Sequence, residues 1–214
     1  AIVAFNGVLQ PLAKQRRTQP ADDLVSVWAN ADIDGFTYDS IRLYHEVGLF
    51  IAGGAETTRT AISHGLRTFC DHPDQWNHLA AHPEAIPTAV EEVIRWVSPL
   101  NNFFRNAAAD TSLAGADLAE GDRLILLYPA ANRDPRVFDD PNRFDTTRSP
   151  NPHLGFGQGT HFCIGANLAR YELAILFEEL TKRITGLSPV TEPDVEPNIF
   201  ARAVRSFHLG FTLR

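Results

Sequence analysis

At 214 residues, of which 44% are hydrophobic, the chain is long enough to bury a sizeable core. Acidic residues outnumber basic ones by 26 to 19, and the formal net charge of −7 argues against nucleic acid as a partner. The two cysteines, Cys70 and Cys163, are too few for a scaffold built on disulfides, so we expect a cytoplasmic protein, kept in a reducing compartment.

Helices dominate the first part of the chain. Capping residues and prolines at helix starts predict five helices, over residues 1–15, 24–30, 37–70, 74–81 and 87–98. Thr37 is the expected N-cap of the long third helix, which at 1.5 Å per residue is roughly 50 Å long. The sequence has no methionine and opens inside the first helix, which indicates part of a longer protein.

The middle of the long helix contains the string A-G-G-A-E-T-T over residues 52–58. Two adjacent glycines inside a helix cost about 1 kcal/mol each relative to alanine, so they need a reason. The two glycines could allow close packing against another helix, or they could serve a function such as ligand binding. Thr57 lies four residues after Gly53, where its hydroxyl can bond that carbonyl and bend or open the helix, and Glu56 adds a carboxylate. Together they predict a groove for a small ligand, with an alcohol to hold it and an acid to supply protons.

The fifth predicted helix carries a weaker signal. Glu92 and Arg95 are three residues apart and are expected to pair on one face of this helix. Most such pairs are surface salt bridges that contribute little to stability, so these residues alone indicate a structural pair.

The second half of the chain changes character. Short apolar runs between residues 100 and 130, among them 124–128, alternate with Gly and Asp turns and predict strands. Residues 132–152 are rich in Pro, Asp, Asn and Arg and predict a long irregular segment. A final helix is expected to end at Gly186 and to be followed by a loop and a strand. Its predicted apolar face consists of Leu168, Leu173, Ile175, Leu176, Leu180 and Ile184. The predicted fold class is mainly α with small β-sheets, in a single domain over residues 1–214.

The most informative string, F-G-Q-G-T-H-F-C-I-G over residues 156–165, directly precedes that helix. Its glycines let the backbone approach a flat ligand closely. Free amide groups at the helix N-terminus favour the thiolate of Cys163 over the thiol. A thiolate held in this way is a metal ligand, or a nucleophile with His161 as its base. The plainest alternative is a glycine turn around a buried structural cysteine.

This string resembles, position for position, the haem-binding loop of the cytochrome P-450 monooxygenases, F-G-x-G-x-H-x-C-x-G. Residues 53–58 are similar to the oxygen-activating motif of that family, (A/G)-G-x-(D/E)-T-(T/S), and Glu92 and Arg95 match its E-x-x-R pair. The resemblance, to soluble bacterial members, covers essentially the whole chain in the family's order. It implies the carboxy-terminal portion of the cytochrome P-450 fold, with the amino-terminal half absent.

The resemblance implies a haem b cofactor whose iron is ligated by the Cys163 thiolate. His161 and Arg105 are then the residues that contact the haem propionates, and Phe156 packs beside the thiolate and excludes water. The expected cofactor-binding residues are Cys163, His161, Arg105, Phe156, Gly157 and Gly165.

For the whole protein, the resemblance implies a monooxygenase that inserts one oxygen atom from O2 into a hydrophobic small molecule. Similar strings in bacterial members suggest that this substrate is a steroid or a terpenoid. Ferredoxin or a similar protein is the expected electron donor. Thr57 and Glu56 are the expected catalytic residues, the first as a hydrogen-bond partner of oxygen and the second as a proton relay. The expected substrate-facing residues are Phe50, Ala52, Leu100, Phe103, Ile199 and Phe200.

The resemblance also implies a third member for the pair formed by Glu92 and Arg95. Arg143, in the string P-N-R-F, is the expected one, and Arg148 is the second choice. This network holds the fold and takes no part in the chemistry. Two other readings of the chain stay open: a non-catalytic fragment, and a haem-free auxiliary protein that retains the fold.

Overall fold

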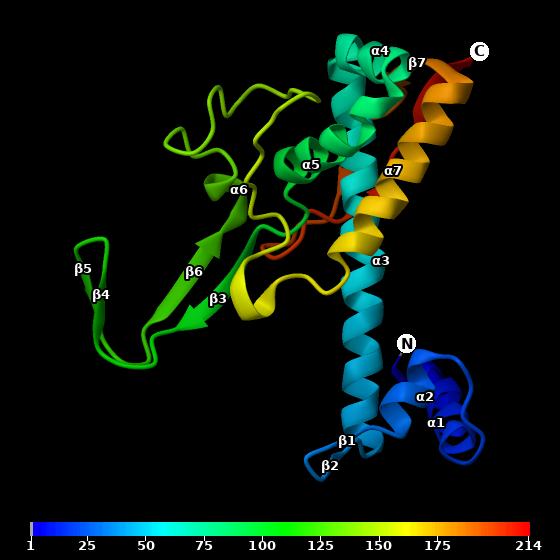
Figure 1. Ribbon diagram of the computed structural model, residues 1–214, viewed down its shortest axis with the longest axis vertical. Coiled ribbons are helices and arrows are strands. Elements are labelled where there is room, and N and C mark those ends of the chain that lie inside the picture. Colours follow the sequence, from blue (N-terminus) through cyan, green and yellow to red (C-terminus); the bar gives the residue numbers. More distant parts are fainter. Residues whose placement is uncertain (1) are drawn as a thin grey trace. The chain divides into compact units, whose positions relative to one another are not determined.

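A computed structural model describes residues 2–214, and it is mainly helical with small sheets, as predicted (Figure 1). The chain separates into two compact units, residues 1–55 and residues 56–214, and the boundary falls inside the long helix α3 (Ser40–Asp71). The expectation of one domain stays a prediction.

Unit 1 contains the first helices and one small hairpin. Its elements are α1 (Ile2–Thr18), α2 (Leu24–Ala29), β1 (Asp32–Ile33), β2 (Phe36–Thr37) and the amino-terminal part of α3. Leu9, Ala13, Leu43 and Val47 form its small apolar core. The predicted helices 1–15 and 24–30 are therefore confirmed, apart from small differences at their ends.

The start of α3 differs from the prediction. Thr37 belongs to strand β2, and Asp39 caps the helix instead, because its carboxylate accepts the N–H groups of Ile41 and Arg42 at 3.0 and 2.8 Å. The β1–β2 hairpin displaces the helix start. Its turn is Asp34-Gly35, both with positive φ (52° and 80°), and this dipeptide is a strong hairpin signal that sequence reasoning passed over.

Unit 2 contains the remaining helices and the cysteine loop. Its helices are α4 (Pro73–Ala81), α5 (Ile86–Val97), α6 (Tyr128–Ala131) and α7 (Ala166–Arg183), with 3-10 turns η1 (Pro83–Ala85) and η2 (Gly159–His161). Helices α4 and α5 confirm the predictions to within about one residue at each end. The short α6 was not predicted, because Tyr128 follows an apolar strand without a break.

Antiparallel two-stranded ribbons make up the sheets of unit 2, where β3 pairs with β6, β4 with β5, β7 with β10 and β8 with β9. The strands are β3 (Asn102–Asn106), β4 (Thr111–Leu113), β5 (Ala116–Leu118), β6 (Arg123–Leu127), β7 (Ile184–Pro189), β8 (Asp194–Val195), β9 (Val204–Ser206) and β10 (Leu209–Leu213). The prediction that α7 ends at Gly186 is wrong. The helix ends at Arg183 because Ile184 is already extended and Gly186 pairs with Thr212 of β10.

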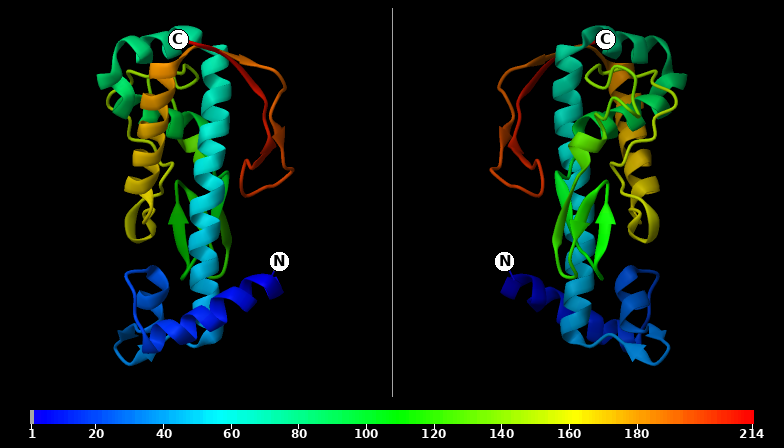
Figure 2. Two further views of the ribbon diagram at one scale, coloured as in Figure 1. Left: turned by 90° about the vertical axis from the view of Figure 1, so that its right-hand side faces the viewer. Right: turned by 90° about the vertical axis from the view of Figure 1, so that its left-hand side faces the viewer.

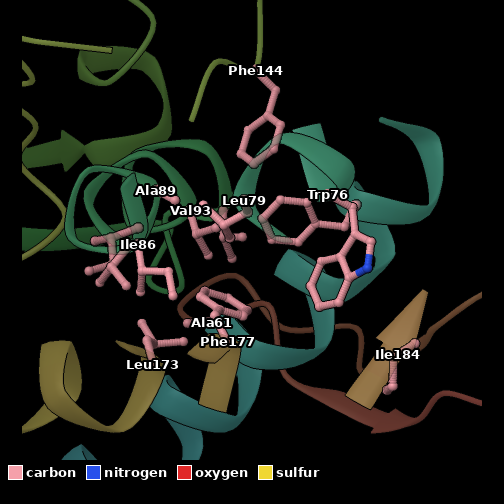
Figure 3. Packing of buried hydrophobic residues seen from close by; sticks show 14 residues of the cluster. Ala61, Trp76, Leu79, Ile86, Ala89, Val93, Phe144, Leu173, Phe177 and Ile184 are labelled. Atoms are coloured by element: carbon pink, nitrogen blue, oxygen red, sulfur yellow. The ribbon is translucent and has the colours of Figure 1, made fainter. Parts of the chain in front are cut away.

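The core of unit 2 packs α4, α5 and α7 against the carboxy-terminal part of α3. Phe69 of α3 contacts Trp76, Phe144 and Phe177 with ring centroids 5.3 to 5.5 Å apart. Figure 3 shows Leu79, Val93 and Phe177 gathered in this core. A Cβ atom on Gly65 would lie 2.9 Å from Val93, so the absence of a side chain there lets α3 and α5 approach closely.

Two further features of unit 2 position the site. Figure 2 shows α7 and the β7–β10 ribbon on either side of the carboxy-terminal part of α3. The segment from residue 132 to 158 contains neither helix nor strand, as predicted, and leads into the cysteine loop. Within residues 2–214, no helix is both long and apolar enough to cross a membrane.

Candidate functional site

The cysteine loop folds back on itself before α7 begins. The Cys163 N–H donates to the Phe156 carbonyl at 2.9 Å, and the Phe162 N–H donates to that of Gly159 at 3.0 Å. Gly157 and Gly159 have φ of 72° and 75°, in the left-handed region that favours glycine. The loop presents Cys163 as an exposed, free thiol, so the alternative of a buried structural cysteine is wrong.

The start of α7 provides polar groups beside the sulfur. Gly165 is the N-cap residue, and a Cβ atom on it would stand 4.0 Å from the Cys163 Sγ atom. The amides of Ile164 and Gly165 donate no hydrogen bond within residues 2–214. These amides and the helix dipole place partial positive charge beside the sulfur.

Two exposed apolar residues flank Cys163 in the sequence. Phe162 is 48% exposed and Ile164 is 85% exposed, on either side of Cys163. Phe156 is half-buried, with its ring 6.2 Å from that of Phe162. His161 is exposed and makes no hydrogen bond to Cys163 within the described chain, so the pairing of a nucleophile with its base finds no support.

Arg105 lies on strand β3, outside the cysteine loop. It is exposed, and its guanidinium donates to the carbonyl of Phe104 at 2.8 Å. It forms no ion pair with any carboxylate among residues 2–214. Its positive charge is therefore not neutralised by a carboxylate in this part of the chain.

Glu92 and Arg95 form a fully buried ion pair, whereas their spacing alone indicated a pair on the surface. Both side chains are 0% exposed, and Arg95 donates to the two carboxylate oxygens at 2.7 and 2.8 Å. The Asp145 N–H and the Asn151 side-chain amide also donate to Glu92, at 2.9 and 3.1 Å. This carboxylate joins α5 to the irregular segment, and its hydrogen bonds offset the cost of burying a charge.

The third member of this network is Arg148, and the prediction of Arg143 is wrong. Arg148 is 10% exposed, and its Nε atom lies 3.2 Å from Glu92. The Arg143 side chain is 64% exposed and lies 3.7 Å from Asp145. Arg143 contributes only its carbonyl, which accepts from Arg95 and Arg148 at 3.1 and 3.0 Å.

Asn132 connects this network to the cysteine loop, and sequence reasoning missed it. Its backbone carbonyl accepts from Arg95 at 2.8 Å, and its side chain donates to the Ser98 hydroxyl at 2.9 Å. Its side-chain oxygen accepts the N–H of Leu154 at 2.7 Å, two residues before Phe156. An asparagine at the head of an irregular segment carries no sequence signal for this role.

The A-G-G-A-E-T-T string is helical throughout, with no opening of α3. A Cβ atom on Gly53 or Gly54 would meet no atom of residues 2–214 within 4 Å outside its own helix. Close packing against another helix of the described chain therefore does not explain these two glycines. In unit 2, Arg59 donates to both oxygens of Glu56 at 2.8 and 2.7 Å, and the Thr60 hydroxyl lies 3.4 Å from the same carboxylate. Thr57 is half-buried.

The predicted substrate-facing residues of unit 2 come together from two distant segments. Leu100 forms an isolated bridge with Ala201, and the rings of Phe103 and Phe200 are 5.2 Å apart. The carbonyl of Ile199, whose side chain is exposed, accepts the side-chain amide of Asn102 at 2.6 Å. Phe50 and Ala52 belong to unit 1, where Phe50 packs edge-on against Trp28 at 4.7 Å.

A cavity of about 370 Å³ lies elsewhere in unit 2, and none of the predicted site residues lines it. Arg133 and Arg202 on its wall donate to the carbonyls of Trp96 and Val97, both at 2.9 Å. These arginines therefore close the carboxy-terminal end of α5. Burial lowers the pKa of both guanidinium groups.

The chain has relatives of known family. The cytochrome P-450 family model matches residues 84–200. The putative cytochrome P-450 126 of Mycobacterium tuberculosis is 48% identical in an alignment of 181 positions, which covers 83% of this chain and 44% of that protein. The steroid C26-monooxygenase of the same species is 39% identical in an alignment of 215 positions, which covers 99% of this chain and 58% of that protein.

Solved structures agree with these relatives. A cytochrome P-450 of Mycobacterium marinum in complex with pseudoionone is similar with a TM-score of 0.93 at 39% identity, over 98% of this chain and 51% of that one. A Bacillus megaterium enzyme in complex with testosterone gives 0.88 at 30% identity, over 97% of this chain and 58% of that one.

These matches confirm the resemblance found in the motifs. The chain spans about half the length of the curated relatives that it matches. Proteins of this kind hold haem iron through a cysteine thiolate. Because the family model covers more than half of the 214 residues, the chain belongs to the cytochrome P-450 family.

Proposed function

We propose that the cysteine loop is the thiolate half of a haem site and that Cys163 is the ligand of the iron. The observation that carries this proposal is the exposed Cys163 thiol at the start of α7, in a loop turned by Gly157 and Gly159. Exposed apolar groups beside the sulfur, Phe162 and Ile164, suit the face of a porphyrin. The donor set of one cysteine in an apolar, glycine-rich cradle therefore fits haem.

The polar edges of haem have candidate partners as well. Haem carries two propionates, and His161 and Arg105 are exposed basic residues that are free of carboxylate partners within residues 2–214. We assign them to the propionates. Phe156, the half-buried first residue of the loop, limits the access of water to the sulfur side of the site.

For the whole protein we propose a monooxygenase that acts on a hydrophobic small molecule. When bound, thiolate-ligated haem supplies the activation of O2, with electrons from ferredoxin or a similar donor in the cytoplasm. Thr57 offers a hydroxyl as hydrogen-bond partner for oxygen, and Glu56 holds and releases a proton at its carboxylate. Arg59 binds both oxygens of Glu56, so the uptake of a proton by this carboxylate requires this ion pair to loosen.

The contact between residues 100–103 and 199–201 supports the substrate assignment. Phe103 and Phe200 form an apolar pair that remains about two-fifths exposed. Relatives are named for steroid oxidation or were solved with testosterone and pseudoionone, which favours a steroid or terpenoid here. Titration of the haem-loaded chain with testosterone and with pseudoionone, followed by the Soret band, tests this class.

The test of the thiolate assignment is the absorption spectrum of the reduced, carbon monoxide-bound chain. We expect the red-shifted Soret band of thiolate ligation in the wild type and its loss in Cys163→Ser. Cys70→Ser is the matched control, because Cys70 lies half-buried on α3, where burial raises the pKa of its thiol. A Cys163→Ser variant with the wild-type spectrum would sink the assignment.

The second candidate is a non-catalytic role for this chain. Electron use separates the two functions. In a haem-loaded, active chain, Thr57→Ala keeps the spectrum but diverts electrons from product to hydrogen peroxide. A chain that shows the thiolate spectrum without any electron use is a fragment that binds haem and does not turn over.

A further inference from the structure

Beneath the cysteine loop lies a second polar network, which the family motifs do not include. Arg170 of α7 donates to both oxygens of Glu91 on α5, at 2.6 and 2.9 Å. His153, which is 3% exposed, contacts the same carboxylate with its Nε2 atom at 2.9 Å. Three segments of unit 2 thus meet at one carboxylate.

The hydrogen bonds fix the form of the histidine. The Gly155 N–H donates to the Nδ1 atom of His153 at 3.1 Å, so this nitrogen is an acceptor. The Nε2 atom therefore carries the hydrogen and donates a hydrogen bond to the Glu91 carboxylate. A neutral imidazole in this tautomer connects the carboxylate to the backbone at the entry of the cysteine loop.

The network ends at the aromatic ring beneath the loop. The Arg170 guanidinium lies 4.5 Å from the centroid of the Phe156 ring, and the His153 ring lies 5.9 Å from it. A guanidinium fixed by a bidentate ion pair stacks on a ring in one position only. The carbonyl of Phe156, in turn, accepts the N–H of Cys163.

We propose that Arg170, Glu91 and His153 form a brace that fixes Phe156 and thereby sets the position of the Cys163 thiolate. They are positioning residues, since they act through Phe156. The inference rests on the proposed haem site for its consequence, but the brace itself is a property of the chain. Charge supports it: burial alone raises the pKa of Glu91, yet the hydrogen bonds from Arg170 and His153 outweigh burial and lower this pKa to about 2.

The first test needs no cofactor and measures hydrogen exchange of the Cys163 amide in the 214-residue chain. This amide reports the bond to Phe156 directly. We expect Arg170→Ala to speed its exchange at least tenfold, and Arg170→Lys, which keeps the charge without the bidentate fork, to give an intermediate rate. Unchanged exchange in both variants would overturn the brace.

Two controls keep that result specific. Glu179→Gln breaks an exposed ion pair with Arg183 on the same helix, and we expect no change at Cys163. The amides of Val93 and Phe177, both in the buried core, must keep their protection in every variant. If Arg170→Ala also loses core protection, Arg170→Lys is compared with Glu179→Gln instead. Faster exchange of the Cys163 amide in Arg170→Lys alone supports the brace. Equal exchange rates in the two variants overturn it.

The second test uses the haem-loaded chain and reads the thiolate. We expect Glu91→Gln and Arg170→Ala to move part of the reduced, carbon monoxide-bound Soret band to the position of inactive forms, with Arg170→Lys restoring most of it. A full thiolate band in all three variants contradicts the positioning role. Loss of the band in Cys163→Ser tests the haem assignment separately, so either proposal can fail while the other stands.

Discussion

Glu91 and Glu92 are neighbours on α5, yet they serve two networks of different character. Consecutive residues on a helix point about 100° apart, so Glu92 faces the irregular segment, whereas Glu91 faces Arg170 of α7 and His153. Glu92 is 0% exposed and accepts from two guanidinium groups, a backbone amide and a side-chain amide. Glu91 is 26% exposed and holds Arg170 and His153 under the cysteine loop. Burial decides the difference: the first network holds the fold, and the second holds one loop.

The largest expected effect comes from the buried pair. Arg95→Ala leaves Glu92 as a buried charge with only part of its partners, which costs about 3–5 kcal/mol of the free energy of unfolding. We expect unit 2 to unfold at markedly lower denaturant and haem loading to fail. Urea unfolding followed by tryptophan fluorescence measures this. A loss of less than about 1 kcal/mol of unfolding free energy in Arg95→Ala would contradict the inference that the buried Glu92 network holds the fold more strongly than the Glu91 network does.

A smaller effect is expected at Arg148, and Arg143 is its matched control. Arg148→Ala removes a hydrogen-bond partner of the buried Glu92 carboxylate and costs about 1–3 kcal/mol of the free energy of unfolding. Arg143→Ala leaves the backbone carbonyl in place and stays within about 0.5 kcal/mol of the wild type. The reverse order in urea unfolding would restore the assignment made from the sequence.

Gly155 lies between the two networks and tests how tightly they clamp the loop. A Cβ atom there would lie 2.6 Å from the Ile94 methyl and 3.2 Å from the His153 ring, so Gly155→Ala forces one of them to move. We expect a loss of about 1–2 kcal/mol in the free energy of unfolding and faster exchange of the Cys163 amide. Gly186→Ala, in open space, is the control. Equal stability of both variants would show that the loop entry is loosely held.

The smallest effect is the pH dependence of the half-buried Glu91 network. Because folding lowers the pKa of Glu91 from 4.5 to about 2, the stability from this group is present above pH 4.5 and is lost as the pH falls toward 2. We expect Glu91→Gln to flatten the fall in unfolding free energy over that window by about 1 kcal/mol, since partial exposure weakens the pair. Glu179→Gln is the exposed control. A slope unchanged by Glu91→Gln contradicts the link between Glu91 and this window.

The sequence predicted the elements well where local signals are strong. Prolines placed α4 and α5, and the cysteine string located the loop before α7. Strand pairing explains both errors, the cap of α3 and the end of α7. The β1–β2 hairpin carries a local signal in Asp34-Gly35 that the prediction passed over, whereas Gly186 pairs with the distant Thr212 and has no local signal.

The site was predictable only where its residues sit in a motif. Cys163 and the pair of Glu92 and Arg95 came from fixed spacings, whereas Asn132 and His153 act through partners more than twenty residues away. The choice between Arg143 and Arg148 depended on which side chain turns inward within an irregular segment. Periodicity is absent there, so only the folded chain decides.

Asn132 has a consequence for how this protein can change over generations. It is 1% exposed, and its carbonyl, its amide nitrogen and its amide oxygen each have a partner. An aspartate at this position lacks the amide N–H that donates to Ser98, and an alanine lacks both side-chain hydrogen bonds. Each single replacement therefore leaves a buried polar group without a hydrogen-bond partner. The lineage can therefore alter this position only together with Ser98 or the loop entry, and a library of single variants should retain asparagine there almost alone.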